Sequence, residues 1–121
     1  MEKLFRLRTG NTIVGYKKQM GNFMFYSKDL YGWNGKEIDF EFEDDFTGFK
    51  DKHDRKLFVE DIVVLTAYPQ DYFIITLDTL LNKFYLVNYK NSTIFDQSID
   101  LIFKDKAKVG RVAFTFEQNA L

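Results

Sequence analysis

Residues 37–43 read Glu37-Ile38-Asp39-Phe40-Glu41-Phe42-Glu43, with apolar and acidic residues in strict alternation. In an extended chain this pattern places the three apolar side chains on one face and the four carboxylates on the other. A period of two is typical of a strand that packs one face against a core and exposes the other to water. We therefore expect a half-buried β-strand over these residues.

Similar patterns recur on both sides of this segment. Gly10-Asn11 and Gly21-Asn22 are turn signals, and residues 31–35 indicate a loop. The intervals between patterned segments are too short for crossover helices, which excludes a βαβ sheet. Alternation, or runs of β-branched and aromatic residues, predicts further strands at residues 3–8, 12–18, 22–27, 61–65, 72–77, 84–89 and 109–116.

Residues 96–106 offer a short helix as the alternative to a strand. Asp96 is a suitable N-cap. Leu101 interrupts an otherwise clean helical face made of Ile99, Ile102 and Phe103. The predicted fold class is therefore mainly β, a small barrel or β-sandwich, with at most one short helix near residues 96–106. No linker-like segment divides the chain, so we expect a single domain over residues 1–121.

The composition is that of a folded protein of 121 residues. Hydrophobic residues make up 45% of the chain and aromatic residues 18%, which provides enough apolar surface for a core. Cysteine is absent, and this excludes disulfides, thiolate zinc sites and thiol nucleophiles. No apolar run is long enough for a signal peptide or a membrane span, so we expect a cytoplasmic protein without membrane contact.

Charge is distributed in blocks that the net charge of −1 conceals. Residues 1–36 carry seven Lys and Arg against two acids, whereas residues 37–45 carry six acids and no base. Opposite blocks of this kind attract each other within one fold or between subunits. We expect that pairing in preference to a polyanion partner.

The segment between residues 46 and 58 has apolar ends around a charged middle, which predicts an exposed tight reversal at residues 52–55. Its basic residues could contact phosphates, with Phe49 and Phe58 as stacking neighbours for single-stranded nucleic acid. Solvation of a surface turn explains the same charges equally well. The candidate binding residues are Lys50, Lys52, His53, Arg55 and Lys56.

Catalytic, metal and cofactor sites are not predicted. His53 is the only histidine, and no nucleophile or orienting group accompanies it. The carboxylates of residues 37–43 lie about 6.5–7 Å apart along one strand face. At that spacing they rarely converge on one Mg²⁺ or Ca²⁺ ion, so a solvated or paired strand face is the preferred interpretation.

Residues 46–63, which read FTGFKDKHDRKLFVEDIV, resemble the signature of the YopX family of phage and prophage proteins. That signature runs phe-thr-gly-leu-lys-asp-lys-asn-gly-lys, an aromatic residue, then gly-asp-ile-val. The sequence departs from it at His53-Asp54, where the family favours Asn-Gly, and at Glu60, where it has glycine. Weaker similarities lie at Lys3-Leu4-Phe5-Arg6, Val109-Gly110-Arg111-Val112 and Glu117-Gln118-Asn119.

The resemblance implies a β-rich fold with an SH3-type barrel element, encoded by a phage or prophage and present in the bacterial cytoplasm. The family has no established activity, so no catalytic residues are carried over. Asp61 could accept hydrogen bonds from turn amides, in which case the signature is structural. We expect a non-enzymatic module that binds a protein partner or self-associates as a homo-oligomer; the alternative is a nucleic-acid-binding small β-barrel.

Overall fold

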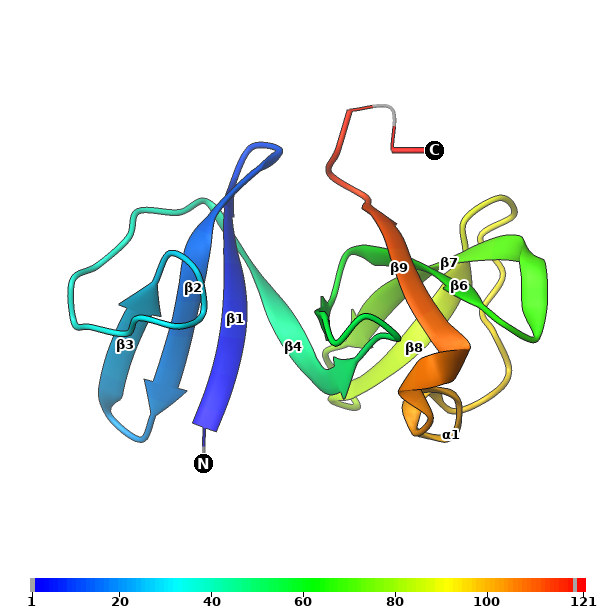
Figure 1. Cartoon of the computed structure of the whole chain (residues 1–121), viewed down its shortest axis with the longest axis horizontal. Helices are drawn as coiled ribbons and strands as arrows, with labels where there is room; N and C mark the ends of the chain where they lie inside the picture. Colours follow the sequence, from blue (N-terminus) through cyan, green and yellow to red (C-terminus); the bar gives the residue numbers. More distant parts are fainter. Residues whose placement is uncertain (1, 119) are drawn as a thin grey trace. The chain divides into compact units, whose positions relative to one another are not determined.

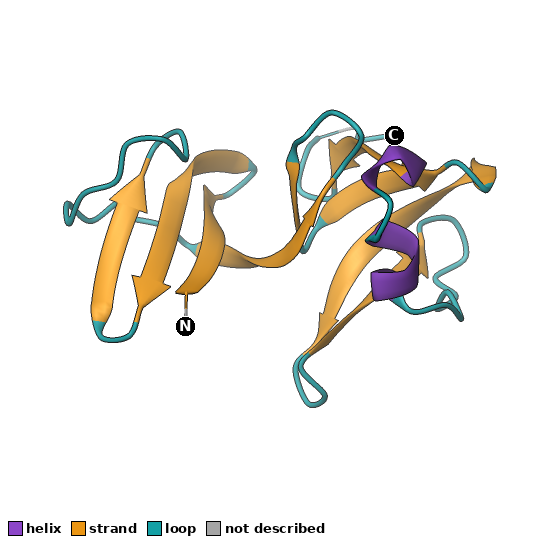
Figure 2. Cartoon of the chain, turned by 60° about the horizontal axis from the view of Figure 1, so that its bottom comes forward, coloured by secondary structure: helices purple, strands orange, loops and turns teal. Residues whose placement is uncertain are grey.

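The structure is a computed structural model that describes residues 2–118 and 120–121. Asn119, part of the C-terminal similarity, lies outside the described residues. The chain is mainly β, with two antiparallel sheets and one short α-helix (Figures 1 and 2). The predicted fold class is therefore confirmed, and neither sheet closes into a barrel among the described residues. No helix in this part of the chain is long and apolar enough to cross a membrane.

The chain forms two compact units, and the first is Met1–Phe46. Strands β1 (Glu2–Thr9), β2 (Thr12–Met20) and β3 (Phe23–Ser27) make an antiparallel meander. The start of β4 (Phe42–Lys50) pairs with β1 on its other side. The small core of this unit consists of Phe5, Leu7 and Tyr26, with Val14 and Ile38 packed against it.

The second unit is Thr47–Leu121 and holds the larger core. Its sheet has the strand order β8-β7-β6-β9. The elements are β5 (Lys56–Phe58), β6 (Asp61–Leu65), β7 (Tyr68–Asp78), β8 (Lys83–Asn88), α1 (Ile99–Phe103), the 3₁₀-helix η1 (Lys106–Lys108) and β9 (Val109–Phe114). Buried in its core are Leu57, Val63, Leu65, Phe73, Ile75, Leu86, Ile99, Phe103 and Val109. The single domain expected over residues 1–121 stays a prediction.

All the expected strands except residues 37–43 are confirmed within a few residues. The short helix offered as the alternative to a strand near residues 96–106 is present as α1, whose buried side chains are Ile99 and Phe103. Leu101, which interrupts the apolar face, is 73% exposed. The cap prediction is wrong, because the N-cap position is Ser98 and not Asp96.

The strand predicted at residues 37–43 is wrong. Strand β4 begins only at Phe42, and Phe40 and Phe42 are 37% and 50% exposed instead of buried. The physical reason is that both rings serve as platforms for cations. The ammonium of Lys17 lies 5.2 Å from the centre of the Phe40 ring, and the guanidinium of Arg8 lies 5.0 Å from that of Phe42.

Candidate functional site

The reversal predicted at residues 52–55 is confirmed. The backbone N–H of Asp51 donates to the carbonyl of Arg55 at 2.9 Å, and that of Asp54 donates to the carbonyl of Asp51 at 2.9 Å. Asp54 has a φ of 61°, a left-handed conformation that aspartate tolerates better than most residues. The turn therefore presents Lys52 and His53 at its exposed tip.

Asp51 was expected in the exposed charged middle of this segment, and that expectation is wrong because its side chain is completely buried. Its carboxylate accepts hydrogen bonds from the backbone N–H groups of His53, Arg55 and Arg111 at 2.9–3.0 Å. The Nε and Nη2 atoms of Arg55 also donate to it, at 3.0 and 2.7 Å. This buried carboxylate organises the turn and ties it to β9.

The pKa of Asp51 reflects the same contacts. Burial raises the pKa, but the hydrogen bonds from the Arg55 side chain and from three backbone N–H groups outweigh burial. Together they lower the pKa from 3.8 to about 2. Asp51 is therefore ionised at neutral pH and acts as a fixed acceptor for the turn.

A hollow of about 420 Å³, which we call the turn hollow, lies beside this turn. Lys52, His53 and Arg55 line it from the turn, and Gly110 and Arg111 line it from β9. Apolar residues of β6 and β9, together with Thr66 and Pro69, complete its wall. The structure thus brings together three of the five predicted binding residues and adds a cation from a distant part of the chain.

The cations of the turn hollow are held in different ways. Arg55 uses Nε and Nη2 on Asp51, and Nη2 also donates to the carbonyl of Arg111 at 2.7 Å. The guanidinium of Arg111 lies 4.6 Å from the centre of the Phe114 ring. Within the described residues, the side chains of Lys52 and His53 form no hydrogen bond or ion pair.

A second basic segment, residues 104–111, lies against the turn. The backbone N–H of Lys52 donates to the carbonyl of Val109 at 2.9 Å, and the ammonium of Lys106 pairs with the carboxylate of Asp54. Residues 50–56 and 104–111 together hold eight Lys and Arg against three Asp, a charge of +5. We call the eight cations the basic surface: Lys50, Lys52, Arg55, Lys56, Lys104, Lys106, Lys108 and Arg111.

The rest of the second unit has the opposite charge. Outside the two basic segments, it carries two Lys against seven Asp and Glu, a charge of −5. This separation was not predicted, because the basic turn was considered without residues 104–111. The available signal was the run of Lys104, Lys106, Lys108 and Arg111 with a single acid among them.

The remaining predicted residues lie outside the turn hollow. Lys50 is exposed on β4 and Lys56 is half-buried on β5. The prediction that Phe49 and Phe58 stack on bases is wrong, because Phe58 is only 2% exposed and Phe49 packs against the core. The ring of Phe49 meets that of Phe103 edge-on, with centroids 5.8 Å apart. Neither ring is placed to stack on a base.

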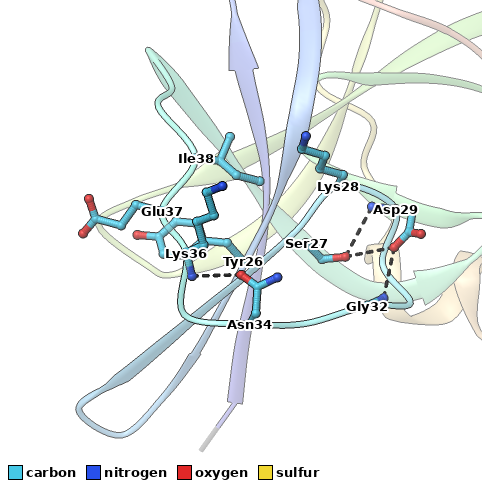
Figure 3. Close-up of a pocket in the computed structure, with 9 residues that line it drawn as sticks. All are labelled: Tyr26, Ser27, Lys28, Asp29, Gly32, Asn34, Lys36, Glu37 and Ile38. Atoms are coloured by element: carbon cyan, nitrogen blue, oxygen red, sulfur yellow. Dashed lines mark hydrogen bonds between the residues drawn. The ribbon is translucent and has the colours of Figure 1, made fainter.

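The first unit contains a hollow of about 570 Å³ inside the loop that follows β3 (Figure 3). Hydrogen bonds from the N–H groups of Gly32 and Tyr31, and from the Ser27 hydroxyl, lower the pKa of Asp29. Lys28 and Lys36 face the same hollow as Asp29 and Glu37, so its charges balance. Asp29 is used to close the loop, and the lining does not select one sign of ligand.

The expected attraction between the basic N-terminal third and the acidic segment is confirmed within the first unit. The Asp44 carboxylate accepts from the Nε atoms of Arg6 and Arg8, at 3.0 and 2.8 Å. Lys17 pairs with Glu43, and Glu41 accepts from the backbone N–H of Gly10 at 2.7 Å. In the part of the chain that the structure describes, no three His, Asp or Glu side chains are arranged to hold a metal ion.

No family model, no curated protein and no solved structure matches this chain. Inference about function therefore starts from the charge and geometry of the second unit.

Proposed function

We propose that this protein is a non-enzymatic interaction module that binds an acidic protein partner through the basic surface of residues 47–121. The observation that carries the proposal is the charge separation, +5 over two adjoining segments and −5 over the rest of the unit. A local field of this size steers an oppositely charged partner and fixes its orientation.

A binding role fits the chemistry of the turn better than catalysis does. The ring of His53, the only histidine, makes no hydrogen bond to any described residue, so no orienting group holds it as a general base. The one strongly perturbed carboxyl there, Asp51, is buried and fully engaged by turn donors. Its role is to shape the surface.

Nucleic acid is the alternative partner, since a basic surface also attracts phosphate backbones. Single-strand binding by small barrels combines such a surface with exposed aromatic side chains on which bases stack. Phe49 and Phe58, the rings nearest the basic turn in sequence, pack in the interior instead. This difference favours a protein partner.

The resemblance to YopX proteins supports a phage or prophage origin and a place in the bacterial cytoplasm. The family signature has glycine at the positions of Asp54 and Glu60, whose φ values here are 61° and 78°. Left-handed backbone is the conformation that glycine adopts most readily. Asp61 also accepts from the backbone N–H of Phe58 at 2.8 Å, as expected for a turn lock. The left-handed backbone at Asp54 and Glu60 and the turn lock at Asp61 support kinship through a shared turn. We propose the SH3-type element from the resemblance alone.

The experiment compares two double variants of the tagged full chain in bacterial cells, with cross-linking and identification of bound protein. Lys104→Gln/Lys108→Gln removes two charges from the basic surface, and Lys83→Gln/Lys90→Gln removes two charges elsewhere in the same unit. We expect an acidic protein, or a second copy of the chain, to be lost from the first variant and kept by the second.

Three results would contradict the proposal. One is a wild-type chain that stays monomeric and retains no protein. Another is an equal loss of partner in both double variants. The third is an oligonucleotide complex at 50 mM salt that Lys104→Gln/Lys108→Gln weakens, in which case nucleic acid replaces the protein partner.

A further inference from the structure

We infer that the turn hollow is a binding site for a phosphoryl group, presented by a phosphorylated side chain of the protein partner. This inference rests on the proposed function and adds the chemistry of the group that is recognised. Its observational basis is the convergence of Lys52, His53, Arg55 and Arg111 on one hollow of about 420 Å³.

The hollow offers donors that the fold leaves available. Lys52 and His53 have no side-chain hydrogen bond to described residues, and the Nη1 atom of Arg55 has none either. These three residues, which carry an ammonium, an imidazole and one guanidinium nitrogen without a hydrogen bond to described residues, line the same hollow. Anionic oxygens make charge-assisted hydrogen bonds with donors of this kind.

The hydrogen bonds that Arg55 already makes favour phosphate over carboxylate as the bound group. A carboxylate is recognised best by two parallel N–H groups of one guanidinium. In Arg55 the Nε–Nη2 edge is occupied by Asp51, and Nη2 also serves the carbonyl of Arg111. What remains on Arg55 is Nη1 alone, beside the ammonium of Lys52 and the imidazole of His53, so the set of donors comes from three separate side chains. Such a set matches a tetrahedral group with three terminal oxygens better than a planar group with two.

Gly110 sets the position of Lys52. A Cβ atom at residue 110 would lie 3.0 Å from Cε and 3.5 Å from Nζ of Lys52. The end of the lysine side chain therefore packs against the glycine, beside the hollow that Lys52 and Arg111 both line. A small residue at 110 is part of the site even though it contributes no side-chain donor.

The dimensions of the site favour one terminal phosphoryl group over a nucleic-acid strand. Lys52, Arg55 and Arg111 converge on a single hollow, whereas a bound strand requires phosphate contacts repeated along a groove and stacked bases. A phosphorylated side chain carries a charge of about −1.5 to −2 at neutral pH and three acceptor oxygens. It can therefore engage several donors of the hollow at once.

The test is an NMR titration of the ¹⁵N-labelled full chain with inorganic phosphate, and with acetate as the carboxylate control. We expect phosphate to shift the amides of residues 52–55 and 109–112, and acetate to bind at least about 5-fold more weakly. Lys52→Gln should weaken phosphate binding about 10-fold, whereas Lys83→Gln, which removes the same charge at an exposed position of β8 outside the basic surface, should change it less than about 2-fold.

Gly110→Ala gives a second test without any change of charge. Displacing the Lys52 side chain should weaken phosphate binding about 3-fold while the rest of the spectrum is preserved. Absence of phosphate binding, shifts spread evenly over the basic surface, or equal effects of Lys52→Gln and Lys83→Gln would overturn the inference.

The source of the phosphoryl group is tested with a phosphoserine peptide, the same peptide unphosphorylated, and a 5′-phosphorylated oligonucleotide. We expect the phosphopeptide to bind at least about 10-fold more tightly than the other two, through Lys52. If the oligonucleotide binds most tightly through Lys52, the phosphoryl site stands and the protein-partner proposal fails. If the cross-linked partner depends on Lys104 and Lys108 but phosphate does not bind, the present inference fails and the proposed function stands.

Discussion

Each unit of this protein buries an aspartate against arginine, and the two arrangements differ in what supplies the remaining hydrogen bonds. Asp44 in the first unit is held by the side chains of Arg6 and Arg8 on the neighbouring strand. Asp51 in the second unit is held by one arginine and three backbone N–H groups. The first arrangement uses two arginines to fix strand pairing, whereas the second uses one arginine to fix a turn and leaves the side chain of Lys52 without a hydrogen bond to any described residue.

The largest effect on stability is expected at Asp44, which pairs with Arg6 and Arg8 in the first unit. Asp44→Asn removes the carboxylate that pairs with the buried Arg6 and the half-buried Arg8, and we expect it to destabilise the protein by about 3 kcal/mol. The measurement is urea unfolding followed by fluorescence of Trp33, the only tryptophan, which lies in the first unit. Asp39→Asn, at an exposed position, is the matched control. A loss below about 1 kcal/mol would show that the buried cluster is not needed.

Asp51→Asn should have the next largest effect and lower the free energy of unfolding by about 2–3 kcal/mol. An amide cannot replace the charged acceptor of so many donors. The folded-state pKa of Asp51, about 2, lies below the ordinary 3.8. Its contribution to stability is therefore present above pH 3.8 and is lost as the pH falls toward 2. Unfolding measured between pH 5 and 2 should have a smaller pH dependence in Asp51→Asn than in wild type. Equal slopes would contradict this assignment.

A packing change in the first unit should have a somewhat smaller effect. A Cβ atom at Gly15 would lie 2.6 Å from Cδ1 of Ile38 and 2.8 Å from the carbonyl oxygen of Ser27. We expect Gly15→Ala to lower the free energy of unfolding by about 2 kcal/mol, because the added methyl group displaces the loop that carries Ile38. Gly32→Ala, where no atom lies within 4 Å of the new Cβ, is the control. The free energies of unfolding of the two variants should differ clearly; similar values would refute the close packing.

The smallest effect is expected for the exposed pair of Lys106 and Asp54. The hydrogen bond from Lys106 lowers the pKa of Asp54, so Lys106→Gln should raise that pKa toward 3.8 in an NMR titration. Because both groups are exposed, the unfolding midpoint should not change measurably. An unchanged pKa would show that the pair does not form in solution.

The strands could be predicted from the sequence because period-two patterns and turn residues are local signals. The prediction failed at Phe40 and Phe42, whose rings meet Lys17 and Arg8 from other strands instead of an apolar core. It failed at Asp51 for a similar reason, since one of its donors, the N–H of Arg111, lies sixty residues away. Local patterning does not reveal which distant charge a residue will meet.

The candidate site was predicted in part. Lys52, His53 and Arg55 were identified because a charged run between apolar ends indicates an exposed turn. Gly110 and Arg111 were not, because only the pairing of the turn with β9 brings them to it. Lys50 and Lys56 share the turn's sequence but lie on β4 and β5, outside the turn hollow.

The proposed function and the proposed phosphoryl site both require that the buried carboxylate of Asp51 assembles the two basic segments into one anion-binding surface. The most direct test is the affinity for inorganic phosphate of Asp51→Asn compared with wild type at pH 7.5, with folding verified by circular dichroism. Removal of a negative charge alone would strengthen phosphate binding. Loss of the carboxylate that positions Arg55 and the turn should weaken it instead, and this is the result we predict. Equal or tighter binding of phosphate by Asp51→Asn would contradict this role of the Asp51 carboxylate.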